Sequence, residues 1–319
     1  MQTLATTAEL RTLYQLSNEI RLTAQPMMRF RMFARMIGAF GTNMGTTYRF
    51  TKVSNLNVSG GRISETGDIP EANDTKSYGE CTVAEYGLQV KWTWLASLLN
   101  QLSMEDLNVI QLRNDAAKVL DNLAAYPLVT CPVIYTPTGG YSSKDAIMST
   151  NGTPPAASTR PVMCWDLQNM VNEGKSRFKI PGFGTQQQYV YITNTQGCQG
   201  IRSDTEFIEA SKYAQPEKLI TGEIGNYFGT RIIEENNVLY NMPGGGGEGV
   251  LFGDDAVIGL EVVPLQIQAG FGGNFNYGRV KGIRWVWVGG FVAPWNYLTD
   301  SQTRAIRVSS NTIAARTAI

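Results

Sequence analysis

The chain has 319 residues, 43% of them hydrophobic, and its 27 Lys and Arg residues balance its 27 Asp and Glu residues. A chain of this length buries a substantial core and usually divides into more than one module. Zero net charge excludes a global basic field that would attract nucleic acid. The absence of histidine excludes Ser-His-Asp and Cys-His catalytic pairs.

Four cysteines are spread along the chain, at Cys81, Cys131, Cys164 and Cys198, and no CxxC pair occurs. Without histidine they complete no zinc set. The sequence therefore predicts reduced, partly buried thiols, no metal site and no cofactor, and disfavours a disulfide-stapled secreted protein. The longest apolar run, 285–295, contains glycine and proline and falls short of the roughly 18–20 residues that cross a bilayer. No membrane span is expected.

Residues 1–45 predict an N-terminal arm with too little apolar surface to fold alone. A helical segment near 8–23 is followed by Pro26 and, at the end of the arm, by a Gly-rich run. A transit peptide or a membrane-surface helix is the alternative, but Pro26 and the glycines interrupt a long amphipathic helix. Met and Phe residues interleave with three arginines that are candidates for contact with a partner molecule: Arg29, Arg31 and Arg35.

Residues 46–93 predict a long hairpin, with strands over Thr46–Leu56 and Val83–Thr93. The interval between them, Ser59–Ser77, is polar and nearly free of large apolar residues. Because such a hairpin has little to bury on its own chain, the pattern favours one that lies on another subunit over a floppy surface loop. Four charged residues at its tip are candidates for that contact: Arg62, Glu65, Asp68 and Glu71.

The clearest helix is expected over 103–125. Ser103 and the acidic residues after it resemble a capping box at the positive end of the helix. Tyr126-Pro127 is expected to stop the helix, which at about 22 residues would be roughly 33 Å long. One apolar stripe follows from the helical spacing of five residues: Val109, Leu112, Ala116, Val119 and Leu123.

Residues 129–254 alternate strands and short helices. Tyr189–Ile192 (YVYI) predicts an apolar strand, and a polar helix is expected over Ser203–Tyr213. The segment 220–236, ITGEIGNYFGTRIIEEN, predicts two short strands joined at Gly225–Gly229, because glycine adopts backbone angles that a side chain forbids.

Pro243–Gly249 (PGGGGEG) is too rich in glycine to hold one shape alone. It predicts a loop that is mobile or is clamped by neighbours. Three of its residues are candidates for contact with a neighbouring molecule: Gly244, Gly245 and Gly246.

Glu173–Ser176 (EGKS) is similar to the end of a phosphate-binding loop, but Asn169 stands where the first glycine is required. A phosphate loop also needs a strand before it and a helix after it. Here a helix is expected over Trp165–Glu173, with Gly174 as its C-terminal cap. No nucleotide site is predicted.

The carboxylate pairs Asp254-Asp255 and Glu234-Glu235 invite a catalytic interpretation, but adjacent residues of an extended chain point to opposite faces. Glycosidase chemistry needs two carboxyl groups that converge across a cleft. We therefore expect both pairs to be solvated or salt-bridged. Trp285 and Trp287 would lie on one face of a strand, either as a sugar-stacking platform or, as is commoner, in the core.

From Asp255 onward, β-branched and aromatic strands return over Ala256–Val263 and Val280–Val292. They are expected to close a sheet beside the helix at 103–125.

The order of these segments resembles that of the major capsid proteins of tailed double-stranded DNA bacteriophages, which have the Hong Kong 97 fold. The matched pieces span roughly 46–236 and include the hairpin loop RISETGDIPE at Arg62–Glu71, the Tyr-Gly break at Tyr86 and the hairpin with the sequence GEIG. Each motif is short and degenerate, so their order carries the specificity. The match is less clear after Gly253.

The resemblance implies an α+β fold of four parts. These are an N-terminal arm (1–45), an extended hairpin loop (46–93), a peripheral domain with a spine helix at 103–125 (94–128 and 255–319), and a central, axial domain (129–254).

The resemblance also implies a structural protein without enzymatic activity. Such a protein self-assembles as hexamers and pentamers into the icosahedral shell of a virion, in the host cytoplasm, and encloses double-stranded DNA with weak, non-specific contact. Portal, scaffolding and decoration proteins would be its partners. The hairpin and the arm would find their partners on sister molecules. Two alternatives remain open: a β-rich carbohydrate-active enzyme, and another virion component such as a decoration or tail protein.

Overall fold

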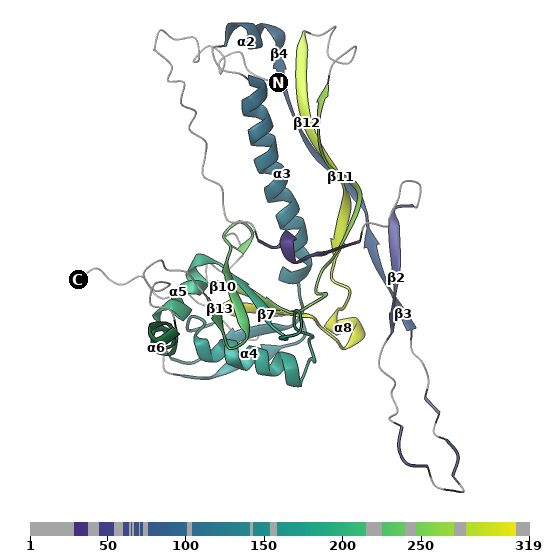
Figure 1. Ribbon diagram of the computed structural model, residues 1–319, viewed down its shortest axis with the longest axis vertical. Helices are drawn as coiled ribbons and strands as arrows, with labels where there is room; N and C mark the ends of the chain where they lie inside the picture. The colour runs from purple at the N-terminus through teal and green to yellow at the C-terminus, as the bar shows by residue number, and fades with distance from the viewer. Residues whose placement is uncertain are drawn as a thin grey trace, which may run out of the picture.

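The computed structural model describes residues 29–37, 45–53, 60–63, 65, 67–69, 71–72, 76–100, 104–140, 143–153, 158–214, 225–239, 247–270 and 279–310. Within these ranges the chain forms an elongated frame, a second body beneath it, and a hairpin that projects from both (Figure 1). None of the helices found in these ranges is long and apolar enough to span a membrane.

The elongated frame consists of helix α3, Met104–Val129, packed against a four-stranded sheet of order β1-β11-β12-β4. The strands of this sheet are β1 (Arg35–Ile37), β11 (Ile258–Gly270), β12 (Val280–Val292) and β4 (Ala84–Thr93). β12 pairs antiparallel with both β11 and β4, whereas β1 pairs parallel with the start of β11. Figure 1 shows α3 running alongside these strands for most of their length.

The apolar stripe of α3 packs against the tryptophans of β12. Leu112 and Ala116 are buried in one cluster with Trp285 and Trp287, whose side chains are 2% and 0% exposed. Trp285 Nε1 also donates a hydrogen bond to Asp115 Oδ2 (2.9 Å). The predicted stripe is confirmed, and the tryptophans are core residues that offer no platform for a sugar.

Helix α3 continues past the expected stop at Tyr126-Pro127 and ends at Val129. Pro127 removes one backbone donor, but Tyr126 still accepts hydrogen bonds at its carbonyl oxygen from the Thr130 amide (3.0 Å) and hydroxyl (2.8 Å). Leu128 is 2% exposed. The expectation was wrong because burial of the last turn compensates for the break. Ser103, the expected cap, lies outside the described residues.

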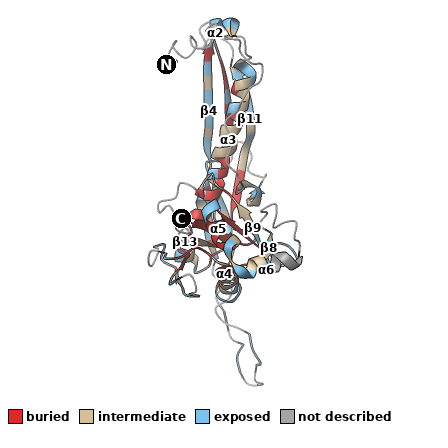
Figure 2. Cartoon of the chain, turned by 90° about the vertical axis from the view of Figure 1, so that its left-hand side faces the viewer, coloured by how far each residue is buried: buried red, intermediate tan, exposed pale blue. Residues whose placement is uncertain are grey.

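The second body is built on a seven-stranded sheet of order β6-β5-β13-β10-β7-β9-β8. Its strands are β5 (Ile134–Pro137), β6 (Ala146–Ser149), β7 (Tyr189–Thr193), β8 (Asn226–Tyr227), β9 (Thr230–Glu234), β10 (Gly247–Phe252) and β13 (Ala305–Ser310). Helices α4 (Cys164–Ser176), α5 (Thr195–Ser203) and α6 (Thr205–Ala214) belong to the same body. In Figure 2 the buried residues, in red, gather in this body near α5 and β13.

The short hairpin expected near 220–236 is present as β8 and β9, joined by Phe228 and Gly229. Both joining residues have positive φ angles, 48° and 70°, as a tight two-residue turn between antiparallel strands requires. The strand predicted at Tyr189–Ile192 is β7. Residues 220–224 of the motif lie outside the described ranges.

Three expectations for this body need correction. β13 pairs with β5 and β10, so the assignment of all of 255–319 to the peripheral domain is wrong for its last strand. Gly174 lies inside α4 and does not cap it, since the helix runs to Ser176. The helix expected over Ser203–Tyr213 is α6, which begins only at Thr205, because Asp204 has an extended backbone and separates it from α5.

The long hairpin is formed by β2 (Thr47–Val53) and β3 (Lys76–Thr82), which pair antiparallel. The expectation that Val83–Thr93 descends beside the rising strand was wrong, because β4 pairs with β12 along its whole length. β3 is polar and contains Gly79, so it resembled a loop in the sequence. Its glycine serves packing, since a Cβ there would lie 2.3 Å from the ring of Phe50.

The described part of the N-terminal arm packs on its own protomer. It forms a short 3-10 helix, η2 (Arg31–Phe33), followed by β1. Phe30 is 1% exposed, and the amides of Phe30 and Arg31 donate hydrogen bonds to Asp121 Oδ1 (2.8 and 3.1 Å). The expectation that the arm relies on sister molecules is therefore wrong for residues 29–37. The helix expected near 8–23 lies outside the described residues.

A buried ion pair holds the loops of the second body together. Arg160 and Asp166 have side chains that are 1% and 0% exposed. Arg160 Nη2 donates to Asp166 Oδ1 (2.8 Å) and to the Asp145 carbonyl oxygen (2.9 Å), and Nη1 donates to Asp166 Oδ2. The hydroxyl of Tyr135 donates to Asp166 Oδ1 (2.9 Å). Both charges are thus compensated within the core.

Removing one partner of this pair should destabilise the protein strongly. We expect Asp166→Asn to lower the free energy of unfolding by about 3–5 kcal/mol, because it leaves the guanidinium of Arg160 buried without its countercharge. Urea unfolding followed by fluorescence measures the change. The matched control is Lys281→Met, which breaks the exposed pair with Glu105 and should cost less than about 1 kcal/mol. Equal losses in the two variants would contradict this account.

Buried carboxylates also lie where α3 meets the second body. Asp121 and Glu235 are 2% and 0% exposed, and Asn237 Nδ2 donates to Asn122 Oδ1 of α3 (2.8 Å). Glu235 accepts hydrogen bonds from the amides of Asn237 and Val238. Burial raises the pKa of Asp121 and of Glu235, and for Glu235 the charge of Asp121 adds to the rise.

This raised pKa predicts a pH dependence of stability. The native state holds the Glu235 proton more tightly than the unfolded chain, so this stabilising contribution is complete below the ordinary pKa of 4.5 and is lost as pH rises through the folded-state pKa. Glutamine does not titrate, so Glu235→Gln lacks this loss. As pH rises, the free energy of unfolding of Glu235→Gln should therefore increase relative to that of the wild type, by about 1.4 kcal/mol for each unit by which the pKa is raised. Urea unfolding between pH 4 and 8 tests this. A difference between Glu235→Gln and wild type that stays constant across this pH range would refute the prediction.

Candidate functional site

The adjacent carboxylates do not form a catalytic centre. Glu234 Oε2 accepts a hydrogen bond from Arg202 Nη2 (2.9 Å), and Asp255 lies 3.5 Å from Arg35 Nη1. Glu235 is buried and accepts backbone amides, so the expectation that it is solvated or salt-bridged was wrong. Its side chain turns inward to close the 235–239 turn. Within the described part of the chain, no group of His, Cys, Asp and Glu residues could hold a metal ion.

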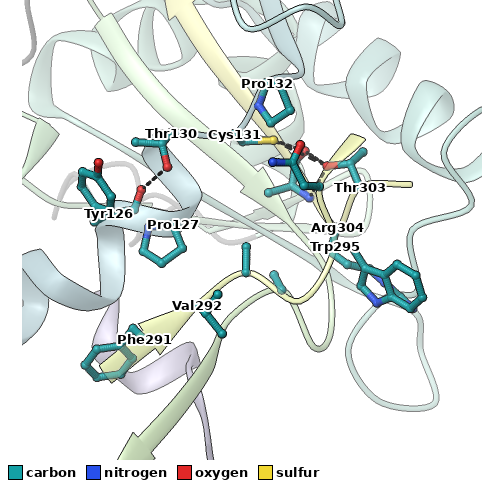
Figure 3. Close-up of a pocket in the computed structure, with 14 residues that line it drawn as sticks. Tyr126, Pro127, Thr130, Cys131, Pro132, Phe291, Val292, Trp295, Thr303 and Arg304 are labelled. Atoms are coloured by element: carbon teal, nitrogen blue, oxygen red, sulfur yellow. Dashed lines mark hydrogen bonds between the residues drawn. The ribbon is translucent and has the colours of Figure 1, made fainter. Parts of the chain in front are cut away.

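A cavity of about 240 Å³ lies between the end of α3 and the segment that connects β12 to β13 (Figure 3). Tyr126 and Pro127 line it from α3, and Trp295 and Arg304 from the connecting segment. Cys131 also lines it, and burial raises the pKa of its thiol, which donates to the Ala305 carbonyl oxygen (3.0 Å). The described lining residues include no carboxylate. They therefore supply neither an acid–base pair nor an activated thiol.

All four cysteines are free and buried. Burial raises the pKa of Cys81 to about 11 and that of Cys198 to about 12. Thiols with so little thiolate are poor nucleophiles and poor metal ligands. The cysteines are therefore packing residues in this fold.

The outer end of the frame carries an exposed apolar tip, formed by helix α2, Trp94–Leu99. Thr93 caps this helix by accepting the Ala96 amide at its hydroxyl (3.2 Å). Four large apolar side chains on the helix are each at least half exposed: Trp94 (51%), Leu95 (56%), Leu98 (59%) and Leu99 (50%). A cluster of this kind on one short helix is typical of a surface that another protein covers. This exposed tip has no signature in the sequence, because only the placement of α2 at the end of the frame exposes these residues.

The two edges of the four-stranded sheet differ. Beyond the three residues that pair with β1, the outer edge of β11 carries Pro264, and the pairing of β11 with β12 has register shifts between Glu261 and Gln266. Proline and irregular register protect an edge strand from pairing with another chain. β4 has neither, since it pairs with β12 in unbroken register over ten residues. Among the described strands, no other pairs with β4. Its free edge can therefore accept an added strand.

The predicted contact residues are distributed over separate surfaces. Arg62, Glu65, Asp68 and Glu71 are all exposed on the long hairpin, beyond the pairing of β2 with β3. Two isoleucines beside them, Ile63 and Ile69, are 49% and 72% exposed. The hairpin tip thus combines acidic and apolar side chains, and the isoleucines were not among the residues singled out in the sequence.

The arm arginines lie apart from the hairpin tip. Arg29 and Arg35 are exposed, while Arg31 is half-buried in η2. Gly244, Gly245 and Gly246 lie outside the described residues.

No protein-family model matches the chain, and no curated protein matches it. Solved structures do match. A chain of the structure titled "Cyanophage Pam1 capsid asymmetric unit" has a TM-score of 0.72 at 14% identity, with 99% of each chain covered. A chain of the structure titled "Acidic stable capsid structure of Helicobacter pylori bacteriophage KHP30" has a TM-score of 0.68 at 13% identity, with 98% of each chain covered.

A chain of the structure titled "Mycobacterium phage Che8" has a TM-score of 0.65 at 14% identity, covering 93% of this chain and 96% of that one. At these identities the likeness concerns the fold. The chain is thus an α+β protein whose fold, along nearly its whole length, is that of chains in the Pam1 and KHP30 capsid structures, and the predicted Hong Kong 97 type is confirmed.

Proposed function

We propose that this chain is the major capsid protein of a tailed bacteriophage, and that many copies assemble as hexamers and pentamers into an icosahedral shell around double-stranded DNA. The observation that carries the proposal is the match over 99% of both chains to a chain of the Pam1 capsid structure. A partial match would support a shared domain only. A match over 99% of both chains supports a shared overall fold.

The long hairpin supports assembly because its own chain leaves apolar side chains of the hairpin uncovered. β2 and β3 form a separate two-stranded sheet, and such ribbons are marginally stable alone. Tyr78 on β3 is 68% exposed, and Ile69 at the tip is 72% exposed. A second copy that covers these side chains would stabilise both molecules by removing apolar area from water. On this view the hairpin and its acidic tip lie across a neighbouring subunit.

The apolar tip on α2 and the free edge of β4 offer further contacts to sister molecules. Each is continuous with the rigid frame formed by α3 and the four-stranded sheet. Obligate contacts usually bury about 2,000 Å² or more, and apolar residues dominate them. Several separate surfaces of this kind let each subunit touch several neighbours, as a closed shell requires.

The remaining partners follow from the same proposal. A shell filled with DNA needs a portal and, during assembly, a scaffolding function, and decoration proteins can bind its exterior. Contact with DNA would be weak and independent of sequence, because the chain has no net charge and only local arginines, such as Arg29, to offer. The protein would reside in the virion and act mechanically, without catalysis.

The state of assembly of the purified chain tests the proposal. Sedimentation velocity and negative-stain electron microscopy should find capsomers or closed shells, with particles in the megadalton range. A chain that remains a monomer at every concentration and salt condition, including in the presence of a scaffold, would overturn the proposal.

A single substitution on α2 should block assembly without unfolding the protomer. We expect Leu98→Glu to shift the chain from shells to free subunits, because a charge at an apolar contact is costly to bury. Its melting temperature should change little, since the side chain is 59% exposed in the protomer. Gln111→Glu, which adds the same charge at an exposed position of α3, is the matched control and should assemble normally. Normal shells from Leu98→Glu would remove α2 from the assembly surface.

A further inference from the structure

The described part of the long hairpin contacts its own protomer at its root and again near Lys52. The root is formed by the end of β3. Cys81 of β3 is 2% exposed and packs against Leu260 of β11, which is 0% exposed. The backbone of Thr82 passes close to Gly290 of β12, where a Cβ would lie 2.3 Å from the Thr82 carbonyl oxygen. The root is therefore held by backbone proximity and by a small apolar cluster.

The second place is at the other end of β2. Lys52 Nζ donates hydrogen bonds to both carboxylate oxygens of Asp300, each at 2.8 Å. The two side chains are only 10% and 9% exposed. Asp300 lies at the end of α8, Tyr297–Asp300, and also accepts the Asn296 amide (3.1 Å). The Asp300 carboxylate is thus also held by the α8 segment itself, independently of Lys52.

Trp295 lies at the same place and is flanked by two cations. Lys52 Nζ is 5.7 Å from the centroid of the Trp295 ring, and the guanidinium carbon of Arg304 is 5.9 Å from it. Cations over an aromatic face are attracted by the ring quadrupole. The indole ring of Trp295 is therefore where three parts of the chain meet: strand β2 of the hairpin, the α8 segment, and Arg304, which precedes β13.

The two contacts together fix the direction of the hairpin, whereas the root contact alone would let the hairpin rotate. Lys52 is five residues from Thr47 at the start of β2, a separation of about 17 Å along a strand. The root alone would act as a pivot, because the hydrogen bonds between β2 and β3 stay within the ribbon and do not orient it. Contact at Lys52 removes that rotation. A largely buried ion pair is suited to fixing this direction, because its hydrogen bonds are directional and because removing one partner costs much stability.

We propose that Lys52, Asp300 and Trp295 form a clasp that fixes the direction in which the long hairpin leaves its own protomer, and that the clasp thereby sets where the hairpin tip meets a second copy. The first half stands on the geometry of the single chain. The second half rests on the proposed function. If the clasp opens, the hairpin keeps its strands but samples a range of directions.

The chain contains a matched control on the same strand. Arg49 Nε lies 2.7 Å from Glu80 Oε1, and this pair joins β2 to β3 without touching the body. Its side chains are 72% and 50% exposed. Arg49→Met therefore removes an ion pair from the hairpin without opening the clasp.

Spin-label distances measure the direction of the hairpin in one chain. One label is placed on the hairpin at Gly61→Cys, where a side chain would meet nothing within 4 Å, and the other on α3 at the exposed Arg113→Cys. The native cysteines are buried and should react slowly. Labelled chains are diluted into excess unlabelled chain, so that only distances within one molecule contribute, whatever the state of assembly.

We expect a narrow distance distribution for the otherwise wild-type chain and for Arg49→Met. Lys52→Met and Asp300→Asn should each broaden the distribution at least twofold. The double variant should be no broader than either single variant, because one interaction is lost in all three. Asp300→Asn keeps an acceptor for the Asn296 amide, so it tests the clasp even if Lys52→Met folds poorly. Unchanged distributions in both single variants would overturn the clasp.

Electron microscopy of the assemblies tests the second half. Lys52→Met and Asp300→Asn should give shells with a wider spread of diameters or with unclosed walls, whereas Arg49→Met should match wild type. Broadened distances together with wild-type shells would overturn the link between the clasp and the shell. If the wild-type chain formed no shells at all, the proposed function would fail while the distance measurement would still decide the clasp.

Discussion

The packing of α3 against the tryptophans of β12 is the interaction to which the rest of the structure is tied. Leu112, Ala116 and Leu120 bury one face of the helix on the four-stranded sheet. Further along the same helix, Ala124, Ala125 and Leu128 belong to the core of the second body. One continuous helix of 26 residues thus contributes to both cores and joins them as a rigid rod. This arrangement gives the subunit a fixed shape although its two sheets are separate.

The frame determines the positions of the parts that project from it. The arm residues beside Asp121, the apolar tip on α2 and the long hairpin are all attached to this frame, so each presents its surface at a defined position. The arm and the hairpin differ in how far their apolar side chains are buried within the protomer. Residues 29–37 are anchored in the protomer through Phe30 and β1, whereas Ile63 and Ile69, in the described part of the hairpin beyond Val53, are exposed. The need for a second copy therefore lies mainly in the hairpin and the tip.

Much of this fold could be predicted from the sequence, because several elements carry local signals. The apolar stripe of α3, the strand β7 and the turn at Gly229 each depend on residues that are close in the chain. The errors concern pairings between distant segments. Nothing local distinguishes β13, which joins the second body, from β12, which joins the frame. β3 is polar, and only its pairing with β2 identifies it as a strand.

The contact role of the candidate residues remains a prediction, and the sequence indicated only part of the surface that the fold exposes, for a physical reason. Charged residues at the hairpin tip could be recognised from composition, because a polar interval between strands must be exposed. The exposed leucines of α2 could not be recognised, since an apolar run in a sequence usually indicates burial. Lys52 and Asp300 are separated by 248 positions and have no local signature, so only the folded chain brings them together.

A reconstruction of the assembled chain by cryo-electron microscopy tests the central claim most directly. The account predicts a closed lattice of copies in which the hairpin around Ile63 and Ile69 lies on a neighbouring subunit, with its apolar side chains covered there. A compact, solitary protomer whose hairpin packs back on its own frame would contradict it.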